Sequence, residues 1–84
     1  MSLQKVFIGR SKCKEAEVNY YLLSEELEDS VGQYGLCVEC GEEAESILRI
    51  TESQNAVLTL LSLLASGGVT PIAVRDVVED WLLM

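Results

Sequence analysis

The 84-residue sequence contains no histidine, and this absence removes several kinds of site at once. Histidine is the commonest general base near neutral pH and a frequent metal ligand. Without it, neither a Ser-His-Asp triad nor a Cys-His pair can be assembled. We therefore expect a protein that is not an enzyme, with no cofactor and no small-molecule substrate.

Basic residues are scarce as well, with six Lys and Arg against 14 Asp and Glu and a net charge of -8. Residues 1–14 contain four of the six and no acid, so this segment carries +4 and the rest of the chain carries -12, which together give -8. A strongly acidic chain repels phosphate groups. We expect no direct nucleic-acid binding and no attachment to an anionic membrane surface.

Long apolar runs are absent. The longest, Ala56 to Ala65, is interrupted by Thr59 and Ser62 and falls short of the roughly 20 residues that span a bilayer. The N-terminus also lacks the apolar core of a signal peptide. These features predict a cytoplasmic protein.

Apolar residues make up 49% of the chain, which excludes disorder and predicts one domain over residues 1–84 with a small core. Alternating apolar residues predict four strands, over residues 4–9, 17–27, 34–40 and 44–50. A loop is expected around residues 30–33, and Gly41-Glu42-Glu43 is expected to form a hairpin turn. Consecutive hairpins give an antiparallel meander. Adjacent Tyr20 and Tyr21 then point to opposite faces of the sheet.

The periodicity changes after residue 50 and predicts two helices, over residues 52–66 and 71–83. Thr51 or Ser53 can cap the first, with Glu52 in its first turn. Gly67-Gly68 ends it, and Thr70-Pro71 begins the second helix. We expect an α+β fold in which this helical hairpin packs on one face of the sheet.

After Glu52, the first predicted helix carries no charge on any face, because no charged residue occurs from Ser53 to Val74. A solvent-facing helix usually carries Lys or Glu. We therefore expect this helix to be covered on two sides, by the sheet and by either the second helix or another subunit.

The three cysteines could form a metal or redox site, because Cys37 and Cys40 make a C-x-x-C pair and Cys13 is a third thiol. A structural zinc site needs four ligands, and an offset of three in a strand points two thiols to opposite faces. We expect both paired cysteines to act as small apolar residues, at least one of them in the core, with no metal bound.

A candidate interaction surface includes Trp81, Tyr21, Asp76, Glu79 and Asp80. Trp81 lies on the apolar stripe of the second helix and is either a core residue or an anchor at an interface. The three acids lie on the polar side of that helix, where they form a solvated face or contact a partner. Tyr21 is the tyrosine that could face outward.

The run Val69-Thr70-Pro71, followed by residues 76–82, resembles the C-terminal signature V-T-P-x-x-V-x-D-V-V-E-D-W-L of a family of small uncharacterised bacterial proteins. This domain of unknown function is found mainly in Gram-positive anaerobes. The Tyr20-Tyr21-Leu22 strand and the Tyr34-Gly35 strand start are similar too, so the resemblance covers about residues 17–83. It implies a cytoplasmic protein and transfers no functional residue.

Three functions stay open on the sequence. The favoured one is a non-enzymatic interaction or regulatory module that docks on a protein or self-associates as a homodimer. The second is an acidic decoy that mimics nucleic acid and occupies a basic protein site. The third, least favoured, is a metal or redox function of the cysteines.

Overall fold

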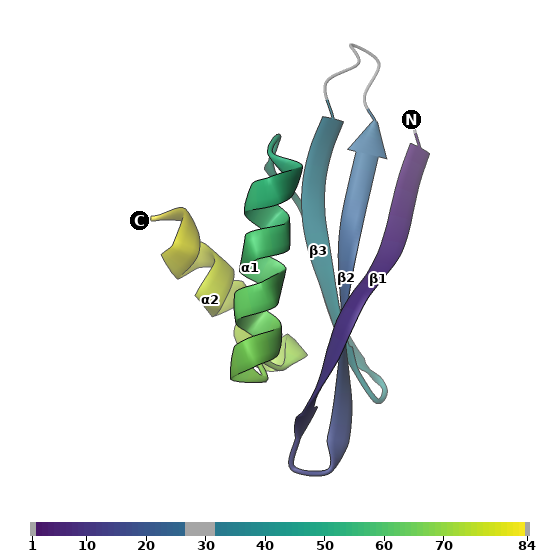
Figure 1. Ribbon diagram of the computed structural model, residues 1–84, viewed down its shortest axis with the longest axis vertical. Coiled ribbons are helices and arrows are strands. Elements are labelled where there is room, and N and C mark those ends of the chain that lie inside the picture. The colour runs from purple at the N-terminus through teal and green to yellow at the C-terminus, as the bar shows by residue number, and fades with distance from the viewer. Residues whose placement is uncertain (1, 27–31, 84) are drawn as a thin grey trace.

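The chain folds as four strands followed by two helices, which confirms the predicted α+β class (Figure 1). The structure is a computed structural model that describes residues 2–26 and 32–83. Its elements are β1 (Ser2–Cys13), β2 (Ala16–Glu26), β3 (Gly32–Cys40), β4 (Glu43–Thr51), α1 (Gln54–Gly67) and α2 (Pro71–Leu82). The sheet order is β1-β2-β3-β4 with every neighbouring pair antiparallel, as expected of a meander. Both helices pack on one face of it.

The first strand is longer than the predicted range of residues 4–9. Gly9 does not end it, because the strand passes through a bulge where the pairing with β2 shifts between Phe7 and Gly9. It continues to a two-residue turn, Lys14-Glu15, with φ of 50° and 75°. Such turns usually carry Asn or Gly, so the sequence holds no signal for this hairpin.

The other strands lie close to their predicted positions. β3 begins at Gly32, so Gln33 is in a strand and not in the predicted loop. Gly41 has a φ of 61° and forms the β3–β4 turn as expected. The predicted strand end at Leu27 and the loop position at Ser30 lie outside the described residues.

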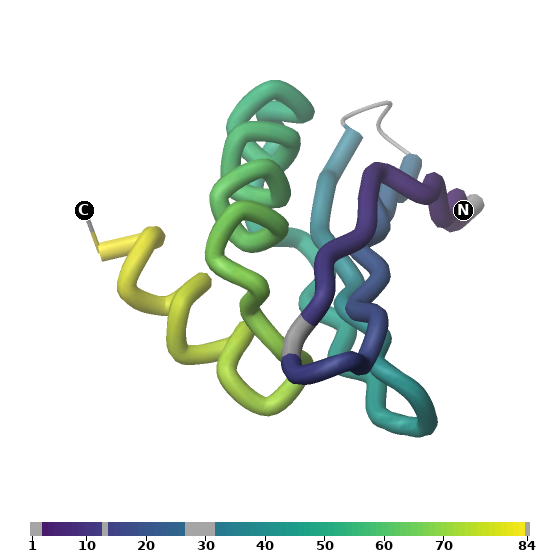
Figure 2. Tube along the Cα trace, turned by 60° about the horizontal axis from the view of Figure 1, so that its bottom comes forward, coloured from purple at the N-terminus to yellow at the C-terminus, as the bar shows by residue number. Residues whose placement is uncertain are grey.

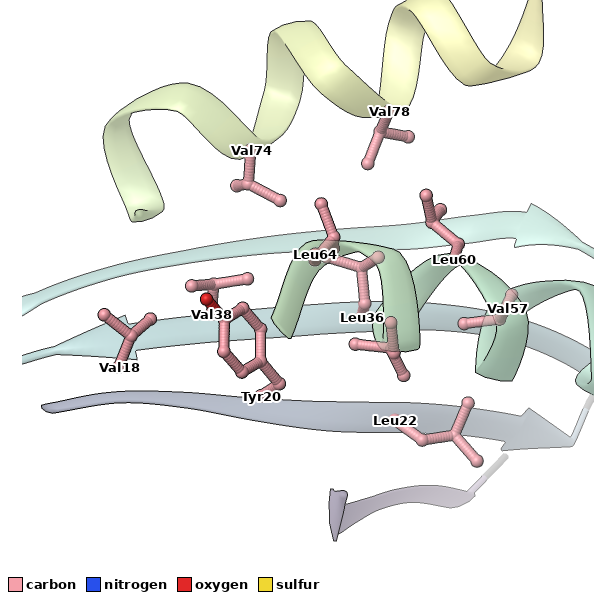
Figure 3. Packing of buried hydrophobic residues seen from close by; sticks show 11 residues of the cluster. Val18, Tyr20, Leu22, Leu36, Val38, Val57, Leu60, Leu64, Val74 and Val78 are labelled. Carbon is pink, nitrogen blue, oxygen red and sulfur yellow. The ribbon is translucent and has the colours of Figure 1, made fainter. Parts of the chain in front are cut away.

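The core lies between the sheet and the helices (Figure 3). Alternation in β2 and β3 and the helical spacing in α1 and α2 bring together Val18, Tyr20, Leu22, Leu36, Val38, Val57, Leu60, Leu61, Leu64, Val74 and Val78. The Tyr20 hydroxyl donates a hydrogen bond to the Val69 carbonyl oxygen at 2.9 Å. This bond ties the centre of the sheet to the link between the helices.

The helix ends follow the capping residues, with one correction. Ser53 is the N-cap of α1 and its hydroxyl accepts a hydrogen bond from the Ala56 amide at 3.2 Å. β4 extends to Thr51, so Glu52 precedes the helix instead of lying in its first turn. Gly68 adopts the left-handed conformation with a φ of 62° and ends α1, as predicted.

The outer face of α1 is exposed, so the expectation that the second helix covers it is wrong. Asn55, Thr59, Ser62 and Ser66 all face solvent on this side. Hydroxyl and amide side chains are solvated without carrying charge, and Thr59 also donates to the Asn55 carbonyl oxygen at 2.9 Å. Within a single chain the absence of charge therefore does not indicate burial, and cover by another subunit stays a prediction.

Candidate functional site

The two helices diverge from their short link (Figure 2). An apolar groove lies between them. It encloses about 210 Å³. The lining combines six apolar side chains with one carboxylate, and comprises Leu60, Leu63, Leu64, Val69, Val77, Asp80 and Trp81. Leu60 and Leu64 are buried in the core and form the floor.

The groove exists because each helix uses one face for the core and leaves an adjoining apolar side chain beside it. In α1, Leu61 and Leu64 are buried against the sheet, while Leu63 is 59% exposed. In α2, Val74 and Val78 are buried, while Val77 is half-buried. An exposed leucine that borders an apolar hollow marks an area where a ligand or protein can exclude water.

Trp81 lines the groove and remains partly accessible. It is half-buried and packs against the core. It also borders a second hollow of about 420 Å³, formed with Ile50, Thr51 and Leu82. A partly accessible tryptophan between two hollows is the kind of side chain that anchors an interface.

The charge at the rim of the groove is negative. Asp80 lines it directly, and Asp76 and Glu79 are exposed on the same helix. The basic residue of α2, Arg75, turns toward β4 and pairs with Glu45 at 3.3 Å. Because α1 carries no charged residue, nothing on that helix offsets these acids.

The structure brings only part of the predicted interaction surface together. Trp81 and Asp80 meet in the groove, and Asp76 and Glu79 lie outside its lining. Tyr21 lies on the opposite face of the sheet, where it pairs with Phe7 of β1. Leu63 was missed as a site residue, although its position at the border of the apolar arc of α1 was the available signal.

The face of the sheet opposite the helices is crossed by two ion pairs. Lys5 of β1 bonds to Glu39 of β3 and lies 4.4 Å from the centre of the Tyr21 ring on the intervening strand. Arg49 of β4 pairs with Glu25 of β2 at 2.9 Å. Long side chains thus cover the middle of a face that neither α1 nor α2 contacts.

These pairs displace the pKa values of their carboxyls. The Lys5 ammonium hydrogen-bonds to Glu39 and holds its pKa below the ordinary 4.5, while the same bond raises the pKa of Lys5 above 10.5. Arg49 lowers the pKa of Glu25 in the same way. All of these groups are near the surface, so the ion pairs are open to screening by salt.

We predict a pH dependence of stability for the Lys5–Glu39 pair, measured by urea unfolding of the wild type and Glu39→Gln. The lowered pKa of Glu39 means that its contribution is present above about pH 4.5 and is lost as the pH falls through the folded value. The raised pKa of Lys5 means that its contribution is present below pH 10.5 and is lost as the pH rises through its folded value.

The variant should therefore lose stability most between these limits and converge on the wild type at both ends. Glu17→Gln is the matched control, because Glu17 forms a looser pair with Arg10 at 3.8 Å. An equal loss at every pH in Glu39→Gln would contradict the prediction.

Cys37 and Cys40 do not converge. Cys37 is 3% exposed and pairs in register with Tyr21, so it faces away from the helices. Cys40 packs against the core on the helix side, and the predicted opposite orientation is confirmed. Cys13 ends β1, and its side chain lies outside the described part. In the described residues, no three Cys, Asp or Glu side chains are grouped to hold a metal ion.

The acids are divided among several elements. Among the described residues, Glu17, Glu25, Glu39 and Glu45 are each paired with a cation. Unpaired exposed acids include Glu42 and Glu43 at the β3–β4 turn and the three acids of α2. This division gives a nucleic-acid mimic no specific support.

Comparison with known proteins adds a family and no activity. Among the described residues, no helix combines the length and apolar character needed to cross a membrane. No curated protein and no solved structure matches the chain. A model for a family of unknown function matches residues 4–84, and the chain therefore belongs to that family, DUF6514.

Proposed function

We propose that the chain is a non-enzymatic protein-interaction module that binds an amphipathic helix of a partner protein in the groove between α1 and α2. The observation that carries this proposal is the hollow bordered by the 59% exposed Leu63 and the half-buried Trp81. A helix is a fitting occupant, because helix-in-groove recognition uses apolar anchors spaced along one face. The apolar lining supplies the surface that such anchors would cover.

The charge of the rim indicates the chemistry of the partner. Asp80 lines the groove beside Trp81, and Asp76 and Glu79 are nearby on α2. A partner helix with Lys or Arg next to its apolar anchors would meet opposite charge and associate faster. A second copy is a poorer occupant, because each chain carries a net charge of -8 and would set acidic α2 faces near each other.

The proposed cellular location of this module rests on the sequence resemblance. We place it in the cytoplasm of a bacterium, in line with the V-T-P signature that begins at Val69. Its regulation or activity would then depend on which partner occupies the groove, and not on a reaction at the groove itself.

Trp81 is the only tryptophan in the chain, so its fluorescence reports directly on the groove. The probes are two helical peptides of one length, built from Leu and Lys or from Leu and Glu. The Leu/Lys peptide should shift the Trp81 emission to shorter wavelength, and the Leu/Glu peptide should not. Leu63→Lys should weaken binding by about tenfold or more, equivalent to about 1.4 kcal/mol, because it removes an apolar contact and adds a repelling charge.

Ile72→Lys is the matched control for this experiment. Ile72 is 79% exposed on α2 and lies outside the groove lining. The Ile72→Lys substitution adds the same charge as Leu63→Lys to the helical hairpin. Because Ile72 does not line the groove, the apolar contacts with the peptide should stay intact. Equal weakening by both variants would show a purely electrostatic effect and overturn the proposal. A doubled mass of the wild type that Leu63→Lys abolishes would instead identify a second copy as the occupant.

A further inference from the structure

The first half of β1 exposes apolar side chains on both faces although it is at the edge of the sheet. Among the described residues, large apolar side chains exposed on this strand are Leu3, Val6, Phe7 and Ile8. Val6 pairs in register with Leu22, so it faces the helix side, and it is still 45% exposed. Phe7 faces the other side and is 47% exposed. At its N-terminal end, β1 lies on the far side of β2 and β3 from α1 (Figure 1).

This half of the edge also lacks the devices that normally prevent strands from pairing. Edge strands are usually protected by outward lysines, bulges or covering segments. Lys5 does not act in this way, because its ammonium group lies over the Tyr21 ring and bonds to Glu39, toward the interior of the sheet. The bulge and the cations Arg10 and Lys12 come only after Phe7.

The opposite edge is protected. β4 carries a pairing irregularity opposite β3, where Arg49 has a φ of 55°. The same strand carries two acids, the exposed Glu43 and the half-buried Glu45. Glu45 pairs with Arg75 of α2. The two edges of the sheet therefore differ, and β1 is the one left available between Gln4 and Phe7.

We propose that residues 5–7 of β1 pair antiparallel with the same residues of a second copy and join the two sheets into one. Opposite residues in an antiparallel pair share a face. With Val6 opposite Val6 of the second copy, Lys5 lies opposite Phe7 in both directions, and no lysine faces a lysine. Each Lys5 then has an aromatic neighbour on both sides, since Tyr21 already lies beneath it.

The ends of this pairing bring basic residues of one copy toward acidic residues of the other. Antiparallel pairing sets the basic end of β1, with Arg10 and Lys12, beside the start of the other β1. That start pairs with the acidic end of β2 through Ser2–Glu26 and Leu3–Glu25. Arg10 and Lys12 of each chain thus lie near the acidic end of β2 in the other, while Lys5 stays paired with Glu39 of its own chain. Pairing of β1 with a β4 edge would leave free edges and grow without limit, whereas pairing of β1 with itself closes.

The test places a charge at Val6, which in the proposed dimer faces Val6 of the second copy. Sedimentation equilibrium of the wild type should show a mass approaching twice 9.3 kDa as concentration rises. Val6→Glu and Val6→Lys should each remain at the single-chain mass, because like charges then face each other. An equal mixture of the two variants should return to the doubled mass, with one copy of each, by native mass spectrometry.

Leu48→Lys is the matched control, because Leu48 is 48% exposed on β4 at the other edge. It should keep the wild-type mass, as should Leu63→Lys, which separates this contact from the groove. A wild type that stays at single-chain mass would overturn the proposal. So would a doubled mass that survives both Val6 variants, or a mixture that fails to recover it.

Discussion

Replacing Gly35 by alanine is expected to destabilise the fold by about 3 kcal/mol, at the upper end of what an added methyl group costs in a packed site. A Cβ at this position would lie 2.1 Å from the Ile47 carbonyl oxygen and 2.9 Å from the Leu48 Cα. Both are backbone atoms of β4, so no side-chain rotation can relieve the contact. The strand itself must move, and its pairing with β3 must weaken.

Gly9→Ala is the control, because it adds the same methyl group to a strand where nothing lies within 4 Å of the new Cβ. It should change stability by no more than about 0.5 kcal/mol. Urea unfolding followed by circular dichroism measures both variants. A loss of the same size in both would mean that the close approach of β4 to Gly35 is not the cause.

The meander could be predicted from the sequence because alternation and turn residues agree over most of it. The β1–β2 hairpin could not, since Lys14 and Glu15 adopt positive φ without the Asn or Gly that usually marks such a turn. The approach of β4 to Gly35 was equally hidden. It depends on a pairing irregularity between Tyr34 and Leu36, and alternation cannot reveal where two strands fall out of step.

The groove was only partly predictable for a related reason. Helical spacing identifies Trp81 as a residue of the apolar stripe, but the depth at which it lies depends on how far α2 diverges from α1. Leu63 belongs to the same apolar arc as Leu60 and Leu64, and only the position of the second helix leaves it exposed. Helical periodicity identifies the apolar face of a helix, but it does not show which residues at the border of that face stay exposed to solvent.

Two leucines of α1 should differ strongly in their contribution to stability, because one lies in the core and the other borders the groove. Leu61 is fully buried against the sheet, and Leu61→Ala should lower the free energy of unfolding by about 3–4 kcal/mol. The loss combines the transfer free energy of the removed carbons with the cavity left behind. A domain of this size has modest total stability, so the variant should be partly unfolded at temperatures where the wild type is native.

Leu63→Ala is the matched change, with the same atoms removed from a side chain that is 59% exposed. Its cost should be below about 1 kcal/mol, because little apolar surface is lost from the core and alanine favours the helix. Leu63→Ala should bind the Leu/Lys peptide more weakly than the wild type, while the midpoint of its thermal unfolding hardly changes. If Leu63→Ala instead destabilised the fold as much as Leu61→Ala, Leu63 would be a structural residue, and the groove would lose the side chain on which its assignment depends.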